Sequence, residues 1–166
     1  MSTIYLAGGC FWGTQHFFSL VKGIESTQVG FANSTVADPS YKLVCTGTTN
    51  AAETVKVDYD AAVIPLAEVL RLYFRTIDPT TVNRQGHDEG TQYRTGIYYV
   101  DDADKPIIDE AVAKLAEQYS QPLAIEVMPL ENFYPAEDYH QDYLYKNPGG
   151  YCHISRELMA YAANHK

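Results

Sequence analysis

The chain has 166 residues, enough for one domain with a single core, and its 46% apolar and 20% charged residues exclude a disordered or low-complexity protein. Its 12 Lys and Arg residues against 21 Asp and Glu residues give a net charge of −9. This charge disfavours nucleic acids and anionic membranes as partners, because both attract basic surfaces.

The first half of the chain alternates between strands and helices. In chain order, the hydrophobic patterns predict a strand over 4–7, a helix over 13–21, strands over 24–32 and 54–59, and a helix over 65–74. Gly8 and Gly9 end the first strand, and a polar loop covers 33–40. The short links between strands in this half indicate a sheet that is not purely parallel.

The second half begins with a polar loop over 78–95 that has no hydrophobic periodicity. A long irregular loop in a compact domain usually has a function. The elements predicted after it are, in chain order, a strand over 95–100, a helix over 104–115, a strand over 123–128 and helices over 136–145 and 154–163. We find no internal repeat or linker, and we expect a single domain over 1–166.

Two features of the sequence indicate the compartment. No apolar run approaches the roughly 20 residues that a membrane helix requires, and the N-terminal segment has no export-signal pattern. We therefore expect a cytoplasmic protein. In a reducing compartment the three cysteines, an odd number that excludes a disulfide scaffold, are thiols, metal ligands or transient redox partners.

Cys10 is the first candidate for chemistry, because it lies between a strand with two glycines and a helix. The N-terminus of a helix favours thiolate over thiol, and the glycines let the backbone approach a reacting group closely. A small buried core residue would explain this position equally well. The neighbouring Phe11 and Trp12 favour an active site, because they can form an apolar pocket for a small group such as a methyl.

Five blocks of sequence resemble the peptide methionine sulfoxide reductase A family. They occur in the family's order and span about residue 4 to residue 154, which is nearly the whole chain. In chain order they are GCFWG at 9–13, PSY at 39–41 with VCTG at 44–47 and AE at 52–53, GHDEGTQYR at 86–94, FYPAEDYHQ at 133–141 and NPGGYC at 147–152.

The resemblance implies thiol-dependent reduction of the S epimer of methionine sulfoxide, free or in proteins, and hence the repair of oxidised proteins. It identifies Cys10 as the nucleophile that attacks the sulfoxide sulfur. Glu53 matches the acid that protonates the sulfoxide oxygen, a role that needs a raised pKa such as an apolar pocket provides. Without the resemblance, a solvated glutamate at the start of a strand would be the simpler interpretation of Glu53.

The remaining site residues also follow from the resemblance. Tyr41 and Tyr93 match two hydroxyl groups that donate to the sulfoxide oxygen. Asp88 matches a carboxylate beside the catalytic cysteine, although a turn or cap in a Gly-containing loop would also explain it. Phe11 and Trp12 would receive the terminal methyl of the substrate.

Cys152 matches the resolving cysteine of the family. A Cys10 sulfenic acid would condense with it to a disulfide, which thioredoxin or a small dithiol would reduce. Residues 146–166 would form a mobile arm that carries Cys152 behind the flexible run 148–150. Cys45 is expected to be buried and inert. No cofactor and no metal are expected.

The fold that the resemblance implies is of the α+β class. It is a two-layer α/β sandwich with a mixed, largely antiparallel sheet, a ferredoxin-like core and a loop-rich C-terminal segment. We expect a monomer whose partners are methionine sulfoxide, free or in peptides, and thioredoxin. Four places depart from the family's usual residues and bear on rate and pocket shape, namely Gln15, Phe31, Asn50–Ala51 and His87.

Three alternatives use the same residues differently. A cysteine hydrolase or acyltransferase would need a base from His16, His87 or His140, and would leave the second cysteine without a role. A thiol peroxidase or redox sensor shares the sulfenic acid chemistry but needs no methyl pocket with an acid. A zinc site is disfavoured, because Cys152–His153 is the one closely spaced pair of cysteine and histidine.

Overall fold

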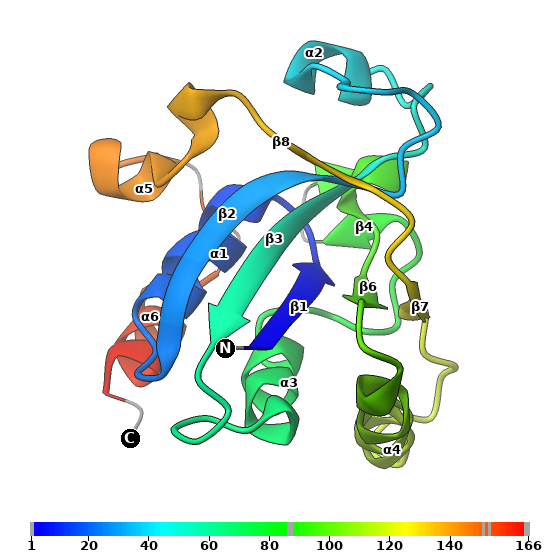
Figure 1. Cartoon of the computed structure of the whole chain (residues 1–166), viewed down its shortest axis with the longest axis vertical. Helices are drawn as coiled ribbons and strands as arrows, with labels where there is room; N and C mark the ends of the chain where they lie inside the picture. Colours follow the sequence, from blue (N-terminus) through cyan, green and yellow to red (C-terminus); the bar gives the residue numbers. More distant parts are fainter. Residues whose placement is uncertain (1, 86–87, 151, 153, 165–166) are drawn as a thin grey trace.

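The computed structural model describes residues 2–85, 88–150, 152 and 154–164, and it contains a curled sheet with helices packed against it (Figure 1). Six strands form the sheet in the order β7-β6-β1-β3-β2-β8. They are β1 (Ser2–Ala7), β2 (Ile24–Ala32), β3 (Ala52–Tyr59), β6 (Gly96–Tyr99), β7 (Glu126–Pro129) and β8 (Phe133–Pro135). Among these strands β6 and β7 run parallel, and the other neighbours are antiparallel.

The helices lie before, between and after the strands. They are α1 (Phe11–Ser19), α2 (Tyr41–Val44), α3 (Leu66–Phe74), α4 (Lys105–Ala116), α5 (Tyr143–Lys146) and α6 (Arg156–Ala163). The smaller elements are the paired strands β4 (Arg84–Gln85) and β5 (Asp88–Glu89) and the 3-10 helices η1 (Thr91–Tyr93), η2 (Asp102–Asp104) and η3 (Asp138–His140). No helix in the part of the chain that the structure describes has the length and apolar character needed to cross a membrane.

Strand alternation divides the buried side chains between the two faces of the sheet. Ile4 and Leu6 of β1 are fully buried in the large core between the sheet and the helices. Tyr5 and Ala7 point to the opposite face, where they form a smaller core with side chains from 128–133. The two faces therefore have different environments, and a side chain's position along a strand decides which one it enters.

The mixed α+β class that the resemblance implies is confirmed. The strand predicted over 24–32 is β2 with the same bounds, and the predicted helix over 65–74 is α3. The polar segment 78–95 contains β4, β5 and η1, which its sequence pattern does not indicate. The elements α2 and β8 are also absent from the prediction, because each is too short to show a period.

The predicted helix over 136–145 is wrong. Asp142 has a φ of +54°, and this left-handed residue separates η3 from α5. The side-chain amide of Gln141 pairs with both backbone groups of Val29 in β2, at 3.0 Å and 2.9 Å. This contact between residues 112 apart holds the chain against the sheet edge instead of in a continuous helix.

The C-terminal segment packs against the helices. Ala162 of α6 is fully buried in the large core, and Arg71 of α3 donates a hydrogen bond of 3.1 Å to the hydroxyl of Tyr161. The mobility predicted for the arm over 146–166 stays a prediction, as does the extent of the domain.

Candidate active site

The candidate nucleophile Cys10 lies in the tight turn between β1 and α1. Gly9 has a φ of +81°, a conformation that residues with a side chain rarely adopt. A Cβ atom at Gly8 would come within 2.5 Å of Cγ2 of Ile77. The two glycines therefore let the strand enter the helix directly, which places Cys10 at the N-cap of α1.

The thiol of Cys10 is 5% exposed, and its pKa is raised. Burial is the main cause, and the carboxylate of Glu53 adds to it. A hydrogen bond from the backbone N–H of Trp12 lowers the pKa, but by less. The helix N-terminus thus acts in the predicted direction through the N–H of Trp12, but desolvation outweighs it in the substrate-free protein.

Glu53 of β3 lies at the N-terminus of α1. It shares the strand parity of Val55 and Val57, so its side chain points to the face that the helices cover. Oε1 accepts a hydrogen bond of 3.2 Å from the N–H of Phe11, whereas Oε2 is buried without a hydrogen-bond partner among the described residues. Burial raises the pKa of Glu53 to about 8, the Phe11 N–H opposes the rise, and the charge of Asp88 adds to it.

Tyr41 and Tyr93 come from two separate loops. Tyr41 begins α2, and its backbone N–H donates a hydrogen bond of 3.2 Å to the carboxylate of Glu137. Tyr93 ends η1, and its carbonyl oxygen accepts a hydrogen bond of 3.3 Å from Gly9, next to the nucleophile. Burial raises the pKa of both phenols and the charge of Glu53 raises it further, so both hydroxyls are neutral donors at physiological pH.

Asp88 lies on the short strand β5 and is partly buried. Its charge raises the pKa values of Cys10, Glu53 and Tyr93, which places the carboxylate within electrostatic reach of all three. The charge of Glu53 acts in turn on Tyr41. Five predicted polar residues therefore lie close enough to influence one another's pKa values, namely Cys10, Tyr41, Glu53, Asp88 and Tyr93.

An aromatic cluster surrounds the two residues that follow Cys10. The buried ring of Phe11 lies 5.7 Å from that of Phe31 and 6.2 Å from that of Tyr41, between centroids. Trp12 is partly exposed and stacks on Tyr143 of α5, with the centroids 3.8 Å and the planes 10° apart. The ring of Phe11 is therefore part of the large core, and the ring of Trp12 packs against it and against Tyr143.

His140 contacts the site in a way that the sequence does not indicate. The indole Nε1 of Trp12 donates a hydrogen bond of 3.0 Å to Nδ1 of His140, across 128 residues of sequence. Burial lowers the pKa of His140, so the imidazole is neutral and carries its proton on Nε2. That Nε2 atom is buried with no hydrogen-bond partner within the described part of the chain. His140 lies in the family block at 133–141, but no local sequence pattern indicates that it pairs with Trp12.

The alternative of a cysteine hydrolase loses support from these contacts. Nδ1 of His140 is occupied by Trp12, and His16 packs edge-on against Tyr145 with ring centroids 4.7 Å apart. In the described residues no histidine hydrogen-bonds to Cys10. His87, the third histidine of that alternative and one of the departures from the family, lies outside the described residues together with Gly86, Tyr151 and His153.

All three cysteines are free thiols. Cys152 is partly buried, and its Sγ accepts a hydrogen bond of 3.4 Å from the N–H of Ile154. Cys152 contributes least among the causes that raise the pKa of Cys10, so it lies within electrostatic reach of the nucleophile. Cys45 is exposed, and the prediction of its burial is wrong, because the one-turn helix α2 buries Val44 and leaves its end in solvent.

Gln15, a departure from the family's usual residue, joins three elements. Its buried Oε1 accepts a hydrogen bond of 2.8 Å from the N–H of Asp142 before α5, and its Nε2 donates one of 3.4 Å to the carbonyl of Thr27 in β2. Of the other described departures, Phe31 and Ala51 are buried in the large core, and Asn50 is exposed. These residues shape the frame of the site and not its reactive groups.

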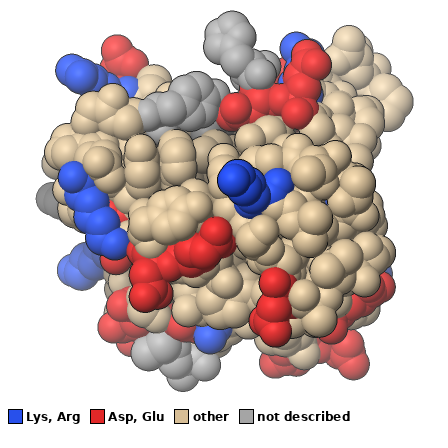
Figure 2. All heavy atoms as spheres, turned by 90° about the horizontal axis from the view of Figure 1, so that it is seen from above, with Lys and Arg blue, Asp and Glu red and all other residues tan. Residues whose placement is uncertain are grey.

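The described residues contain no group of three or more His, Cys, Asp or Glu side chains that could hold a metal ion. Figure 2 shows lysine and arginine side chains that are separated from one another by uncharged and acidic ones, with one basic side chain near the middle of the view.

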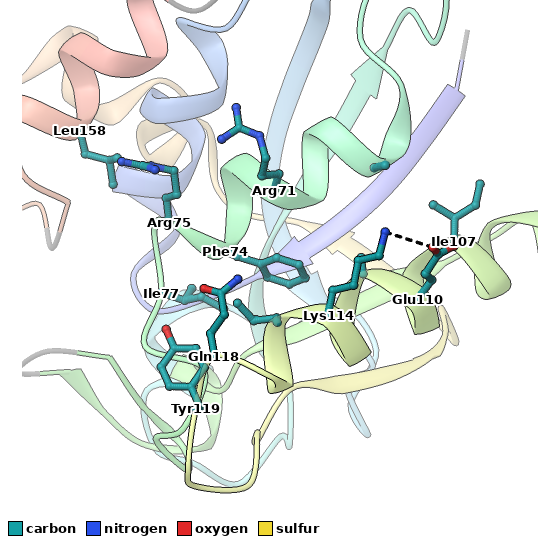
Figure 3. Close-up of a pocket in the computed structure, with 13 residues that line it drawn as sticks. Arg71, Phe74, Arg75, Ile77, Ile107, Glu110, Lys114, Gln118, Tyr119 and Leu158 are labelled. Carbon is teal, nitrogen blue, oxygen red and sulfur yellow. Dashed lines mark ion pairs between the residues drawn. The ribbon is translucent and has the colours of Figure 1, made fainter.

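A groove with a volume of about 810 Å³ lies elsewhere, between α3 and α4 (Figure 3). Phe74 and Ile77 line its apolar part, and Arg75 and Lys114 lie at its sides. None of the candidate site residues is among the described residues that line it. The active-site chemistry therefore does not use this groove.

Proteins similar to this chain match it over nearly its whole length. The family model described as "Peptide methionine sulfoxide reductase" matches residues 2–166. The "Peptide methionine sulfoxide reductase MsrA" of Lachnoclostridium phytofermentans is 56% identical over 162 residues, which are 98% of this chain and 98% of that protein.

Two solved structures of Mxr1 from Saccharomyces cerevisiae are also similar. The reduced form has a TM-score of 0.88 at 40% identity, over 92% of this chain and 90% of that chain. The complex of Mxr1 with Trx2 has a TM-score of 0.61 at 27% identity, over 85% of this chain and 83% of that chain.

Proposed function

Because the chain belongs to the peptide methionine sulfoxide reductase family, we propose that it reduces the S epimer of methionine sulfoxide, free or in proteins, with Cys10 as the nucleophile. Thiol-dependent reduction of methionine sulfoxide, with thioredoxin as the reductant, is the activity that the family assigns to the chain. The epimer and the roles of the individual residues are the finer part of the proposal. The repair of oxidised proteins is its biological use.

The environment of Glu53 carries this proposal. One carboxylate oxygen is held by the N–H of Phe11 at 3.2 Å, beside the nucleophile, and the other has no partner among the described residues. With its pKa raised to about 8, Glu53 is protonated in most molecules at pH 7. A neutral carboxylic acid next to a thiol is the donor that a sulfoxide oxygen needs.

The first step converts the sulfoxide and the thiol to a sulfide and a sulfenic acid. The sulfur of Cys10 attacks the sulfoxide sulfur while Glu53 donates its proton to the oxygen, and Tyr41 and Tyr93 donate hydrogen bonds to that oxygen. The thiol proton passes to Glu53, which is then ready for the next cycle. The OH group then moves from the substrate sulfur to the sulfur of Cys10. The substrate S–O bond and the new S–S bond between Cys10 and the substrate break, an S–O bond forms on Cys10, and methionine leaves, so that no proton is gained or lost overall.

The methyl group of the substrate selects the orientation of the attack. Phe11 and Trp12 provide the apolar walls, and the hydrogen bond to His140 holds the indole of Trp12 in place. A methyl group packed there presents the sulfoxide sulfur to Cys10 and its oxygen to the acid side of the site. Asp88 orients polar groups beside Cys10.

The second and third steps restore the thiol. Cys152 attacks the sulfenic acid, the S–O bond breaks, and water and a Cys10–Cys152 disulfide form. A thioredoxin dithiol then reduces the disulfide to two thiols and leaves as its own disulfide. The similarity of the chain to Mxr1 in its complex with Trx2 supports this partner.

The proposal also includes the finer predictions on the fold, the location, the oligomeric state and the cofactors. The four central strands lie in the order β6-β1-β3-β2, which supports the ferredoxin-like core of a two-layer sandwich. A cytoplasmic location, a monomeric state and independence of any cofactor or metal are proposed from the sequence and the family.

A racemic peptide sulfoxide tests the activity and the epimer together. We expect the S epimer to disappear with dithiothreitol or with thioredoxin and its reductase, and the R epimer to remain, when chiral chromatography follows both. The same rate in the presence of a metal chelator is expected if the reaction needs no metal. Persistence of both epimers would refute the activity, and consumption of the R epimer alone would refute the assigned stereochemistry.

A further inference from the structure

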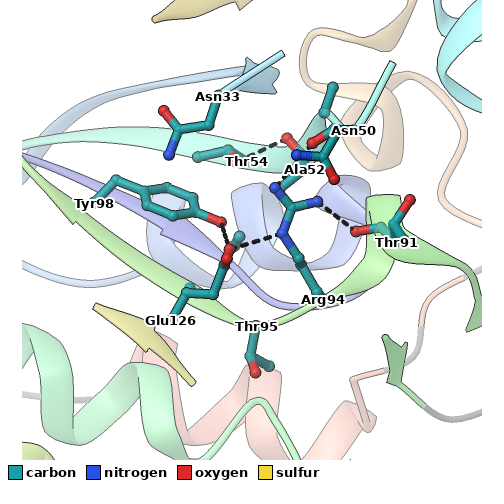
Figure 4. Close-up of polar contacts among 12 residues, drawn as sticks. Asn33, Asn50, Ala52, Thr54, Thr91, Arg94, Thr95, Tyr98 and Glu126 are labelled. Carbon is teal, nitrogen blue, oxygen red and sulfur yellow. Dashed lines mark hydrogen bonds and ion pairs between the residues drawn. The ribbon is translucent and has the colours of Figure 1, made fainter. Parts of the chain in front are cut away.

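Arg94 makes three hydrogen bonds that join three separate segments (Figure 4). Its Nε donates to Oε1 of Glu126 in β7 at 2.7 Å. Its Nη1 donates to the carbonyl of Thr91 in η1 at 2.8 Å, and its Nη2 to the carbonyl of Asn50, just before β3, at 2.9 Å. The planar guanidinium therefore fixes these three acceptors relative to one another.

Two of these segments carry groups of the proposed mechanism. Asn50 has a φ of +54° and forms the turn that leads into Glu53 three residues later. Thr91 begins the 3-10 helix that ends at Tyr93, whose carbonyl accepts the N–H of Gly9 beside the nucleophile. The guanidinium thus connects the turn before the acid to the helix that holds the phenol.

Burial and a further hydrogen bond restrict the ion pair between Arg94 and Glu126. The Arg94 side chain is 11% exposed, and Glu126 Oε1 also accepts a hydrogen bond of 2.7 Å from the fully buried Tyr98. Register places Glu126 and Tyr98 on the face of the sheet away from the helices, where Tyr98 belongs to the smaller core. The contact therefore lies on the face of the sheet opposite to the one into which the side chain of Glu53 points.

We propose that Arg94 is a positioning residue, which sets the placement of Glu53 relative to Tyr93 by clamping the segments that carry them. The inference rests on the proposed function, because it presumes that Glu53 and Tyr93 act on the sulfoxide oxygen. A lysine at this position would be a point charge that cannot reach all three acceptors in one plane. Displacement of catalytic groups by about 1 Å can lower a rate by about 100-fold.

The variant Arg94→Lys tests the inference in single-turnover assays of the intact protein with dithiothreitol absent. We expect the rate of sulfenic acid formation at saturating substrate to fall by about 10- to 100-fold, with a smaller change in the half-saturating concentration. A loosened turn at Asn50 admits water to Glu53 and lowers the pKa of the acid, so we expect the rate to fall at a lower pH than in the wild type. Loss of stability alone would not shift this pH dependence.

Two further variants keep the result interpretable. Arg71→Lys makes the same change at an arginine of α3 that pairs with Glu68 far from Cys10, and we expect its rate and pH dependence to equal those of the wild type. Glu126→Ala removes the anchor in β7 at a 39% exposed carboxylate, and we expect a smaller shift in the same direction as Arg94→Lys.

If the wild type is active and both Arg94→Lys and Glu126→Ala have its pH dependence, this inference is overturned and the proposed function stays intact. A wild type that reduces neither epimer would overturn the proposed function, and the inference with it. If Arg94→Lys does not fold, the pH dependence of Glu126→Ala decides.

Discussion

The indole nitrogen of Trp12 donates a hydrogen bond of 3.0 Å to Nδ1 of His140, and this contact joins the helix of the nucleophile to the C-terminal part of the chain. The imidazole is 1% exposed and lies among the rings of Phe11, Tyr41 and Tyr139. One neutral imidazole therefore supports both the apolar wall beside Cys10 and the tyrosine of α2. In the proposed mechanism the histidine acts on the shape of the pocket, and the carboxylic acid of Glu53 supplies the proton.

We predict that His140→Phe impairs substrate binding more than chemistry. A phenyl ring keeps the packing but leaves the indole N–H of Trp12 without its acceptor, a loss of about 1 kcal/mol or more. We expect kcat/KM to fall by roughly 5- to 30-fold, mainly through KM, in steady-state assays with thioredoxin. A variant with unchanged KM would show that Trp12 needs no anchor.

The parts of the fold that follow local patterns could be predicted from the sequence. The alternation in β2 and β3 and the helical spacing in α3 are local properties, and the glycines before Cys10 indicate a tight turn. The predicted helix over 136–145 fails because the amide of Gln141 pairs with Val29, a residue 112 positions away that no local pattern reveals.

The same distinction applies to the site. Cys10, Glu53 and the tyrosines could be identified because they lie in family blocks, whereas their environment could not. The raised pKa of Cys10 depends on desolvation by the folded chain, and the exposure of Cys45 depends on where a single helical turn lies. The clamp formed by Arg94 joins segments 44 residues apart, and its role follows only from the assembled structure.

The reductase step should depend on a group with a pKa of about 8, the value to which burial raises Glu53. Since the mechanism uses the protonated acid, we expect the single-turnover rate to be high below that pH and to fall as the pH rises through it. Glu53→Gln keeps the shape of the side chain but has no acidic proton, so we expect a rate at least about 100-fold lower and without this dependence. Stopped-flow measurements between pH 6 and pH 10 check both, and an unchanged rate in the variant would refute the acid role.

The burial of Glu53 should also lower the stability of the protein at neutral and alkaline pH. Its pKa is raised from 4.5 to about 8 on folding, so the acid is protonated in both states below pH 4.5 and the folded state loses stability as the pH rises from there to about 8. Glu53→Gln removes this loss. We expect the variant to gain a few kcal/mol relative to the wild type between pH 4 and pH 8.5, measured by urea unfolding at both. An equal difference between the two proteins at both pH values would mean that Glu53 titrates normally in the folded state.

Replacement of Cys152 and of Cys45 by serine should have different effects on the catalytic cycle. Cys152→Ser retains Cys10 and Glu53, so we expect one methionine per protein in a single turnover at close to the wild-type rate. Without the resolving thiol no disulfide forms, and we expect turnover with thioredoxin to fall by about 100-fold or more, with a sulfenic acid that dimedone traps on Cys10. Cys45→Ser is the matched control, because this exposed thiol follows α2 and has no part in the proposed cycle, and a serine hydroxyl can replace it in its hydrogen bond with Tyr41. We expect it to keep both activities. Sustained turnover of Cys152→Ser with thioredoxin would remove the resolving role, and its loss in Cys45→Ser would transfer that role to Cys45.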